Sequence, residues 1–197
     1  MWPGDFPRSL STGKEDSMAN LQEGGARPLT IGEIALARSV FGDAIKYSEV
    51  KVHNKSYLPF NMQSTDVAMT PNGELYFREP HYRDDFSIEV PRYKHWFIHE
   101  MVHVLQHQIG MNVRTRGAFS WAASYNYSLP PDKKLSDFGM EQQASIISDF
   151  YYLINYGLGD FRNIAGFEGI IGPDLKDKYL QVLSLFIQNP KDRRVWL

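Results

Sequence analysis

The stretch YKHWFIHEMVHVLQHQI, residues 93–109, decides the architecture that this sequence predicts. Its apolar residues cover most faces of a helix, which is typical of a helix that is buried on nearly all sides. Gly110 follows directly and favours a helix end there. Two of its histidines, His99 and His103, lie four positions apart, so they project from one face of the helix, one turn from each other. We therefore expect a buried helix that carries two neighbouring imidazoles.

This pair of histidines has the spacing of two zinc ligands on one helix. Glu100 follows the first of them, so its carboxylate would flank the ion and act as a general base toward a zinc-bound water. Burying these three side chains in so apolar a helix is costly unless they have a partner, and a metal ion supplies one. The alternative is a helix with two core histidines and a solvent-facing glutamate. We expect the zinc site, with Zn²⁺ as cofactor.

A hydrolytic zinc site has a third protein ligand and leaves the fourth position to water. The extended metzincin pattern would need Gly and His where this chain has Gln106 and Ile109, so that class is excluded. His107 lies one turn beyond His103, but three successive turns of a straight helix cannot converge on one ion at about 2 Å. We expect His107 to be an ordinary polar residue. The third ligand must come from elsewhere in the chain.

The next strongly helical segment, residues 140–156, is the preferred source of that ligand. Glu141 begins it, and the segment is apolar enough to pack against the zinc helix. A glutamate in a first helical turn also interacts favourably with the helix dipole, without any metal. Asp137 and Asp149 are alternative ligands, and Asp149 could instead orient a ligand histidine. The chain has no cysteine, so any transition-metal site here must use His, Asp or Glu.

Two tyrosines precede that helix. They lie in residues 111–139, a stretch that mixes Gly, Pro, Ser and Tyr and is expected to be a long functional loop. Tyr125 and Tyr127 could each donate a hydrogen bond to the oxyanion of a tetrahedral intermediate, and ordinary aromatic packing is the alternative for both. Residues 74–77 could form an edge strand that pairs with an extended peptide substrate.

The rest of the chain predicts one α+β domain over residues 28–197, preceded by a flexible arm over residues 1–27. Thr30 and Glu33 form a capping-box pattern at the start of a helix that Gly42 would end. We expect a small, mostly antiparallel sheet packed on a helical core that holds the zinc helix. The other expected elements are strands at 47–53, 67–70 and 74–77, a turn at 71–73, loops at 78–91 and 111–139, and a last helix at 174–187.

The overall composition excludes several classes of protein. The net charge is −2 and the basic residues are scattered, which argues against a nucleic-acid partner. No apolar stretch approaches the length of a membrane span, and residues 1–7 lack the pattern of a secretory signal peptide. We therefore expect a protein that is made in the cytoplasm, with export by a signal-independent route left open.

The sequence His-Glu-Met-Val-His at 99–103, followed by Glu141, resembles the gluzincin arrangement of zinc metallopeptidases. More narrowly, residues 28–157 are similar to bacterial Vgr-related or Rhs-associated proteins, which often occur near type VI secretion loci as metallopeptidase effector domains. The matching pieces are 29–52, AMTPNGELYF at 68–77, the zinc helix and EQQA at 141–144.

This resemblance implies His99, His103 and Glu141 as zinc ligands and Glu100 as the catalytic base. The chain departs from the family at one position, because many gluzincins have an acidic residue four places after the ligand glutamate, where this chain has Ser145. The groups that support the ligands are therefore left open.

Two functions follow as hypotheses. The first is a zinc hydrolase that cleaves peptide bonds in a protein or peptide, with a peptidoglycan peptide as the second substrate class. It would be an antibacterial effector whose partners are a secretion apparatus or an immunity protein. The second is an inactive, zinc-stabilised adaptor module of a secretion apparatus, in which protein ligands would fill all four positions around the ion.

Overall fold

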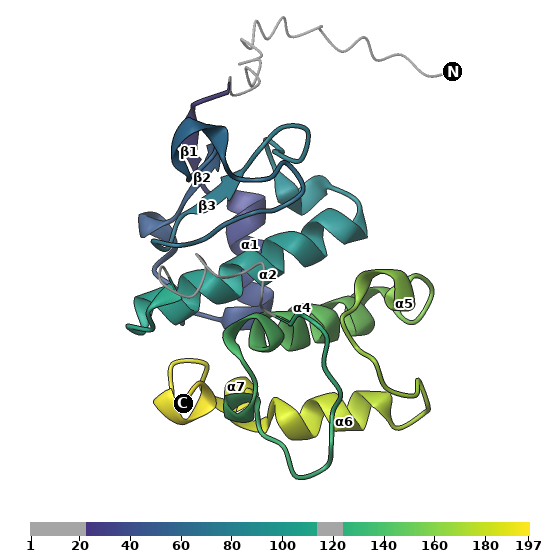
Figure 1. Ribbon diagram of the computed structural model, residues 1–197. Helices are drawn as coiled ribbons and strands as arrows, with labels where there is room; N and C mark the ends of the chain where they lie inside the picture. Colours follow the sequence, from purple (N-terminus) through teal and green to yellow (C-terminus); the bar gives the residue numbers. More distant parts are fainter. Residues whose placement is uncertain (1–22, 114–123) are drawn as a thin grey trace, which may run out of the picture.

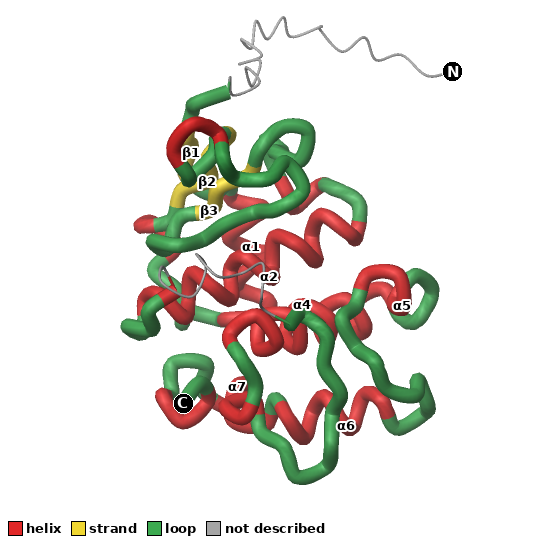
Figure 2. Tube along the Cα trace, viewed as in Figure 1, coloured by secondary structure: helices red, strands yellow, loops and turns green. Residues whose placement is uncertain are grey.

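Two long helices, α2 (Pro91–Gln108) and α4 (Met140–Tyr156), pack against each other in the centre of the molecule. The structure is a computed structural model that describes residues 23–113 and 124–197. Figures 1 and 2 show a small sheet on one side of this helix pair and the C-terminal helices on the other. The expected α+β fold is confirmed.

Helix α2 is as deeply buried as its sequence predicts. Pro91 occupies its first position, where the missing N–H breaks no intrahelical hydrogen bond. Residues 97–106 are buried without interruption, and the apolar ones among them pack into a single core. Helix α4 begins and ends at the predicted residues. Because α2 and α4 pack side by side, the polar residues on their facing surfaces lie close to one another.

Helix α1 (Ile31–Phe41) begins with the predicted capping box. The Glu33 amide donates to Thr30 Oγ1 at 3.0 Å, and the Thr30 amide donates to Glu33 Oε2 at 2.9 Å. Arg27 donates to both carboxylate oxygens of Glu33, at 2.7 and 2.8 Å, which offsets the cost of burying that charge completely. Arg27 belongs to the predicted N-terminal arm, and this ion pair connects the end of that arm to α1. Residues 1–22 of that arm lie outside the described residues.

The sheet has three strands, β1 (Ala26–Pro28), β2 (Lys51–Asn54) and β3 (Leu75–Phe77), in that order. Strand β2 pairs antiparallel with β1 and parallel with β3. The sheet is therefore mixed, and the expectation of a mostly antiparallel sheet was wrong. The parallel pairing arises because 20 residues, 55–74, separate the two strands and allow the chain to cross over.

The predicted hairpin over 67–77 is reduced to one antiparallel bridge. Met69 and Tyr76 exchange two backbone hydrogen bonds of 3.1 and 2.9 Å. The hairpin does not extend because the Gln63 side chain donates to the carbonyls of Val67 and Tyr76, at 2.7 and 3.0 Å. Residues 66–71 thus lie outside β3 and cover the strand edge that was expected to receive a substrate.

The C-terminal part packs against α4 from the other side. The predicted helix over 174–187 is two helices, α6 (Leu175–Val182) and α7 (Ser184–Gln188), interrupted at Leu183. Helix α5 (Phe161–Ile164) was not predicted, because four residues are too few to show helical periodicity. The buried Trp196 closes this part of the core.

Short 3-10 helices replace parts of the predicted strand and loops: Tyr47–Glu49, Phe86–Ile88 and Leu135–Asp137. Residues 114–123 of the predicted functional loop lie outside the described residues. Among the residues that the structure does describe, none forms a helix long and apolar enough to cross a lipid bilayer.

Candidate metal centre

The contact between α2 and α4 brings together the three side chains for which a ligand role was predicted. Helix α2 presents His99 and His103 on one face, and Glu141 faces them from the first turn of α4. Glu141 Oε2 lies 3.3 Å from Nε2 of His99 and 3.1 Å from Nε2 of His103. Within the described part of the chain, these three residues are also the group whose ligand atoms could hold a metal ion, all lying within 4.8 Å of one another.

These distances fit a tetrahedral ion. With metal–ligand bonds of about 2.0–2.1 Å, two ligand atoms of a tetrahedral zinc site lie roughly 3.3 Å apart. The distances of 3.3 and 3.1 Å between Glu141 Oε2 and the two imidazole nitrogens match that separation. The donor set of two neutral nitrogens and one carboxylate oxygen is also one that zinc accepts in hydrolytic sites. The residues present therefore fit a divalent zinc ion.

The pKa values of His103 and Glu141 show that the buried carboxylate is stabilised by a positive charge beside it. Burial lowers the pKa of His103, but the neighbouring Glu141 carboxylate outweighs burial and raises that pKa to about 9. Burial raises the pKa of Glu141, yet the two imidazoles pull it well below its usual range. Without metal, a proton on His103 thus compensates the buried carboxylate. A divalent cation would take the place of that proton.

A chain of amides holds His103 in the orientation that ligation requires. Its Nδ1–H donates to Oε1 of Gln106 at 2.8 Å, which leaves Nε2 pointing at Glu141. The Gln106 amide donates in turn to Oε1 of Gln143 at 2.9 Å, and the Gln143 amide donates to the carbonyl of Trp196 at 3.3 Å. Sequence reasoning used Gln106 only to exclude metzincins and missed this role.

Glu100 lies beside the two histidines and is 4% exposed. Its Oε2 accepts a hydrogen bond of 2.7 Å from the hydroxyl of Thr70, which follows the bridge residue Met69. The hydroxyl fixes the carboxylate without neutralising it. Thr70 was not predicted, because nothing in its local sequence shows that the 66–71 segment crosses over α2.

The two predicted oxyanion donors lie in different surroundings. The Tyr125 ring lies 6.0 Å from the His99 ring and is 41% exposed. Burial of the phenol and the charges of Glu141 and Glu100 raise its pKa, so its hydroxyl keeps its proton at neutral pH. Tyr127 is 3% exposed, and its hydroxyl donates to Asp149 at 2.6 Å. Its only proton is thus used at Asp149, and Tyr125 is the one of the two tyrosines that lines the cavity described below.

The alternative ligands lie elsewhere. Asp137 is exposed and accepts from the Lys134 amide at 2.8 Å. His107 is exposed and outside the cluster, as expected. Asp149 does orient a histidine, but this is His95, whose Nε2–H donates to it at 2.7 Å, and not a predicted ligand. His95 lies one turn before His99, and that spacing could have drawn attention to it.

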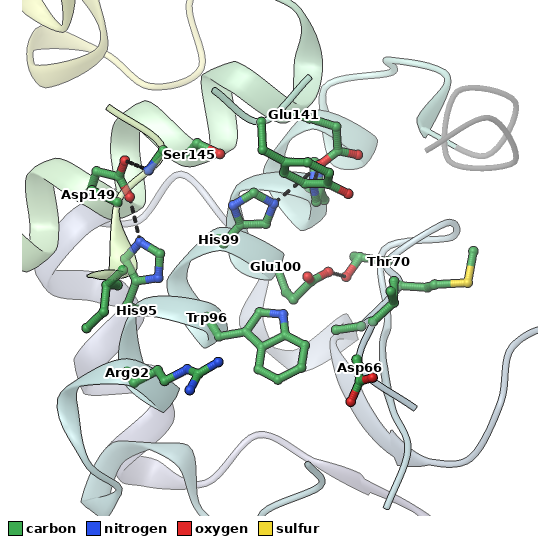
Figure 3. A pocket seen from close by; sticks show the side chains of 18 of the residues that line it. Asp66, Thr70, Arg92, His95, Trp96, His99, Glu100, Glu141, Ser145 and Asp149 are labelled. Atoms are coloured by element: carbon green, nitrogen blue, oxygen red, sulfur yellow. Dashed lines mark hydrogen bonds and ion pairs between the residues drawn. The ribbon is translucent and has the colours of Figure 1, made fainter. Parts of the chain in front are cut away.

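A cavity of about 500 Å³ opens above the three converging side chains. Residues 66–71 form one wall, α2 forms the floor, and Tyr125, Ser145 and residues 163–166 line the other side. Figure 3 shows His99, Glu100 and Glu141 directed into this space, with Thr70 touching Glu100. The candidate centre is thus open to a molecule larger than water.

Comparison with known proteins identifies relatives. No protein-family model matches the chain. It is 41% identical over 152 residues to the type VI secretion system spike protein VgrG2b of Pseudomonas aeruginosa, an alignment that covers 74% of this chain and only 15% of that protein. The solved structure of the effector domain of Pseudomonas aeruginosa VgrG2b superposes with a TM-score of 0.61 at 37% identity, covering 77% of this chain and 89% of that domain. This chain belongs to the family of the VgrG2b effector domain.

Proposed function

We propose that this protein is a zinc-dependent hydrolase that cleaves peptide bonds. The convergence of His99, His103 and Glu141 on one point at the floor of an open cavity carries the proposal. The adaptor hypothesis needs a closed site in which protein groups fill the coordination sphere. Among the described residues, three ligand groups converge, and the space above them is large enough for a peptide segment.

The residues around the cavity have different roles in the proposed reaction. Bound at the three ligands, zinc would supply a Lewis acid and lower the pKa of a water molecule. Glu100, held by Thr70, takes the proton of the attacking water and passes it to the leaving amine. The protonated hydroxyl of Tyr125 donates to the developing oxyanion. The covered edge along residues 66–71 offers a wall along which an extended peptide can lie.

The family relationship supports a role as a secreted effector. The curated relative is a spike protein of the type VI secretion system, and the matching solved structure is its effector domain. We infer that this chain is delivered by such an apparatus and acts on a target in the recipient cell. A protein or peptide is the first substrate class and a peptidoglycan peptide the second. An immunity protein that blocks the cavity would protect the producing cell.

The experiment that tests the activity compares the parent with Glu100→Gln. Zinc content and hydrolysis of a denatured protein are measured for both, with the exposed Glu49→Gln as matched control. Glu100→Gln should keep one zinc ion per chain and lose roughly 10²–10⁴-fold in kcat, the range that a general base contributes. Equal activity of this variant and the parent would rule out the mechanism. Bound zinc without hydrolysis of protein or peptidoglycan by the parent would favour the adaptor module.

A further inference from the structure

The cavity extends along α2 well beyond the three converging side chains. Its floor runs from His103 through His99 and His95 to Arg92, in the first turn of the helix. Steps of three and four residues keep these side chains on one face. At 1.5 Å per residue, Arg92 lies about 10 Å along the helix from His99. Figure 3 shows Arg92 and His95 at one end of the cavity and Glu141 at the other.

The carboxylates that line this cavity already accept hydrogen bonds. Each carboxylate that lines it has a hydrogen-bond donor within 3.4 Å: His99 and His103 for Glu141, Thr70 for Glu100, His95 for Asp149, and His81 for Asp66.

Arg92 differs from these groups because it has no hydrogen-bond or ion-pair partner among the described residues. Its guanidinium forms neither an ion pair nor a hydrogen bond with any residue in 23–113 or 124–197. Among the described residues that line the cavity, no other is a lysine or an arginine. An unpaired arginine on an open surface is common. Arg92 is also exposed, but it lies at the rim of a space that leads directly to the candidate metal centre, so its unused donors are available to whatever fills the cavity.

The wall between Arg92 and the metal centre is held in place by its neighbours. The Trp96 ring packs edge-on against Phe77, with ring centres 5.4 Å apart, and lies 5.2 Å from the His81 ring. His95 is fixed by its hydrogen bond of 2.7 Å to Asp149, which is 1% exposed. The distance from the Arg92 backbone to the candidate ligands is therefore set by one helix and a packed wall, as a specificity subsite requires.

We propose that Arg92 recognises a carboxylate on the peptide substrate, about three residues from the scissile bond. The inference rests on the proposed peptidase function. A guanidinium matches a carboxylate with two parallel hydrogen bonds, and an extended peptide advances about 3.3 Å per residue, so three residues span the distance from the candidate ligands to Arg92. An acidic side chain or a free C-terminal carboxylate would supply the same group.

The test uses peptides that differ in one charge. In a common sequence, a single Glu is moved from the fourth position before the cleavage site to the fourth after it, each peptide paired with its Gln counterpart. A second set compares free and amidated C-termini. Values of kcat and KM are measured for the parent, Arg92→Ala and Arg92→Lys. Lys94→Ala is the matched control, because Lys94 lies on the same helix outside the cavity lining.

The parent should prefer the carboxylate about tenfold in kcat/KM at one register, and the preference should reside in KM. Arg92→Ala should abolish it, Arg92→Lys should restore part of it, and Lys94→Ala should keep it. Preference within the Glu series assigns the carboxylate to a side chain, and preference within the free-acid series assigns it to a C-terminus. Efficient cleavage without charge preference, or a preference that survives Arg92→Ala, overturns the subsite and leaves the peptidase function standing.

A binding measurement separates the subsite from catalysis. The same labelled peptides are titrated by fluorescence anisotropy onto Glu100→Gln with and without Arg92→Ala. Carboxylate peptides should bind about tenfold more tightly to the chain that keeps Arg92. This result would support the subsite even where the parent cleaves none of the peptides, which would count against the proposed function alone. Equal affinity for Glu and Gln peptides, or no measurable binding of either, overturns the subsite.

Discussion

Two regions of this molecule each place a buried histidine against a carboxylate, and only one has the geometry of a metal centre. At the sheet, His53 Nε2 lies 2.7 Å from Glu74, and the ring stacks on Tyr76 with ring centres 4.2 Å apart. Between α2 and α4, two imidazoles approach one oxygen of Glu141 at 3.1 and 3.3 Å. The sheet pair is closer, yet it offers a single imidazole and lies outside the cavity lining. The two regions differ because three ligand groups converge between α2 and α4, and because an open cavity gives access to them.

The pKa values of the two histidines shift in opposite directions. Burial lowers the pKa of His53 more than the nearby Glu74 raises it. At His103, the attraction to Glu141 prevails over burial. Nδ1 of His53 is also buried and has no hydrogen-bond partner within residues 23–113 and 124–197, whereas Nδ1 of His103 donates to Gln106. The sheet pair is therefore a packing contact, and the helix pair has the electrostatics and geometry of a candidate cation site.

The largest effect is expected from removing one imidazole of the helix pair. His103→Ala should weaken zinc binding by more than about 100-fold, because loss of a ligand exceeds the 10- to 100-fold cost of losing a group that supports one. His53→Ala should leave the affinity unchanged. Isothermal titration with zinc compares the two variants with the parent, and equal affinities for both would remove the distinction between the regions.

A pH series on the metal-free chain comes next. His103 has a folded pKa of about 9 against 6.5 when unfolded, so its contribution to the free energy of unfolding is present below pH 6.5 and lost as pH rises through 9. The loss is at most about 3 kcal/mol at 1.36 kcal/mol per pKa unit. His53, with its lowered pKa, has the opposite sign, and its contribution is lost as pH falls below 6.5.

Urea unfolding at pH 6.5 and 9 measures this effect. With zinc bound, the decrease toward pH 9 should disappear, because zinc binds the neutral imidazole. Glu141→Gln, which lacks the carboxylate, should show little decrease even without zinc. A parent whose stability does not change between these pH values would contradict the assigned electrostatics.

A smaller effect is expected from the amide chain behind His103. Gln106→Leu removes the acceptor of the Nδ1–H and should lower zinc affinity about 10- to 30-fold, within the range for groups that orient a ligand. Gln108→Leu, at a position on the same helix that faces Lys46, is the control. Competition with a chromogenic chelator gives both values, and identical affinities would show that Gln106 only packs.

The smallest effect should follow from replacing the sheet histidine with an apolar ring. His53→Phe keeps the stack on Tyr76 and eliminates the unpartnered Nδ1, while Glu74 retains Lys51 at 3.9 Å. The free energy of unfolding should change by no more than about 1 kcal/mol, with zinc content and hydrolysis unaffected. A loss of zinc in this variant would place the metal at the sheet and overturn the comparison.

The fold could be predicted where local signals are strong. The capping box at Thr30, the limits of α4 and the burial of α2 follow from cap chemistry and helical periodicity. Local signals do not suffice where distant groups decide the structure. The side chain of Gln63 truncates the expected hairpin, and Arg27 ties part of the expected arm to Glu33. Neither partner can be found from a local pattern.

In the candidate site, too, features within one helix could be predicted and features that depend on tertiary contacts could not. The spacing of His99 and His103 and the place of Glu141 in the first turn of α4 could be predicted, because each of these features lies within one helix. Thr70 and Gln143 reach the site through tertiary contacts, and Asp149 contacts a histidine other than the expected ones. Tyr127 could not be told apart from Tyr125 in the sequence, since burial separates them only after the chain has folded.

The amide chain from His103 also has a practical consequence for anyone who expresses this protein. Three side-chain links connect the candidate metal centre to the carbonyl of Trp196, and the Trp196 indole N–H donates to the carbonyl of Pro190 at 2.8 Å. Leu197, the next residue, is 65% exposed. An affinity handle placed after Leu197 should therefore be tolerated, whereas removing Trp196 and Leu197 would loosen the anchor behind a candidate ligand imidazole more than 90 positions away.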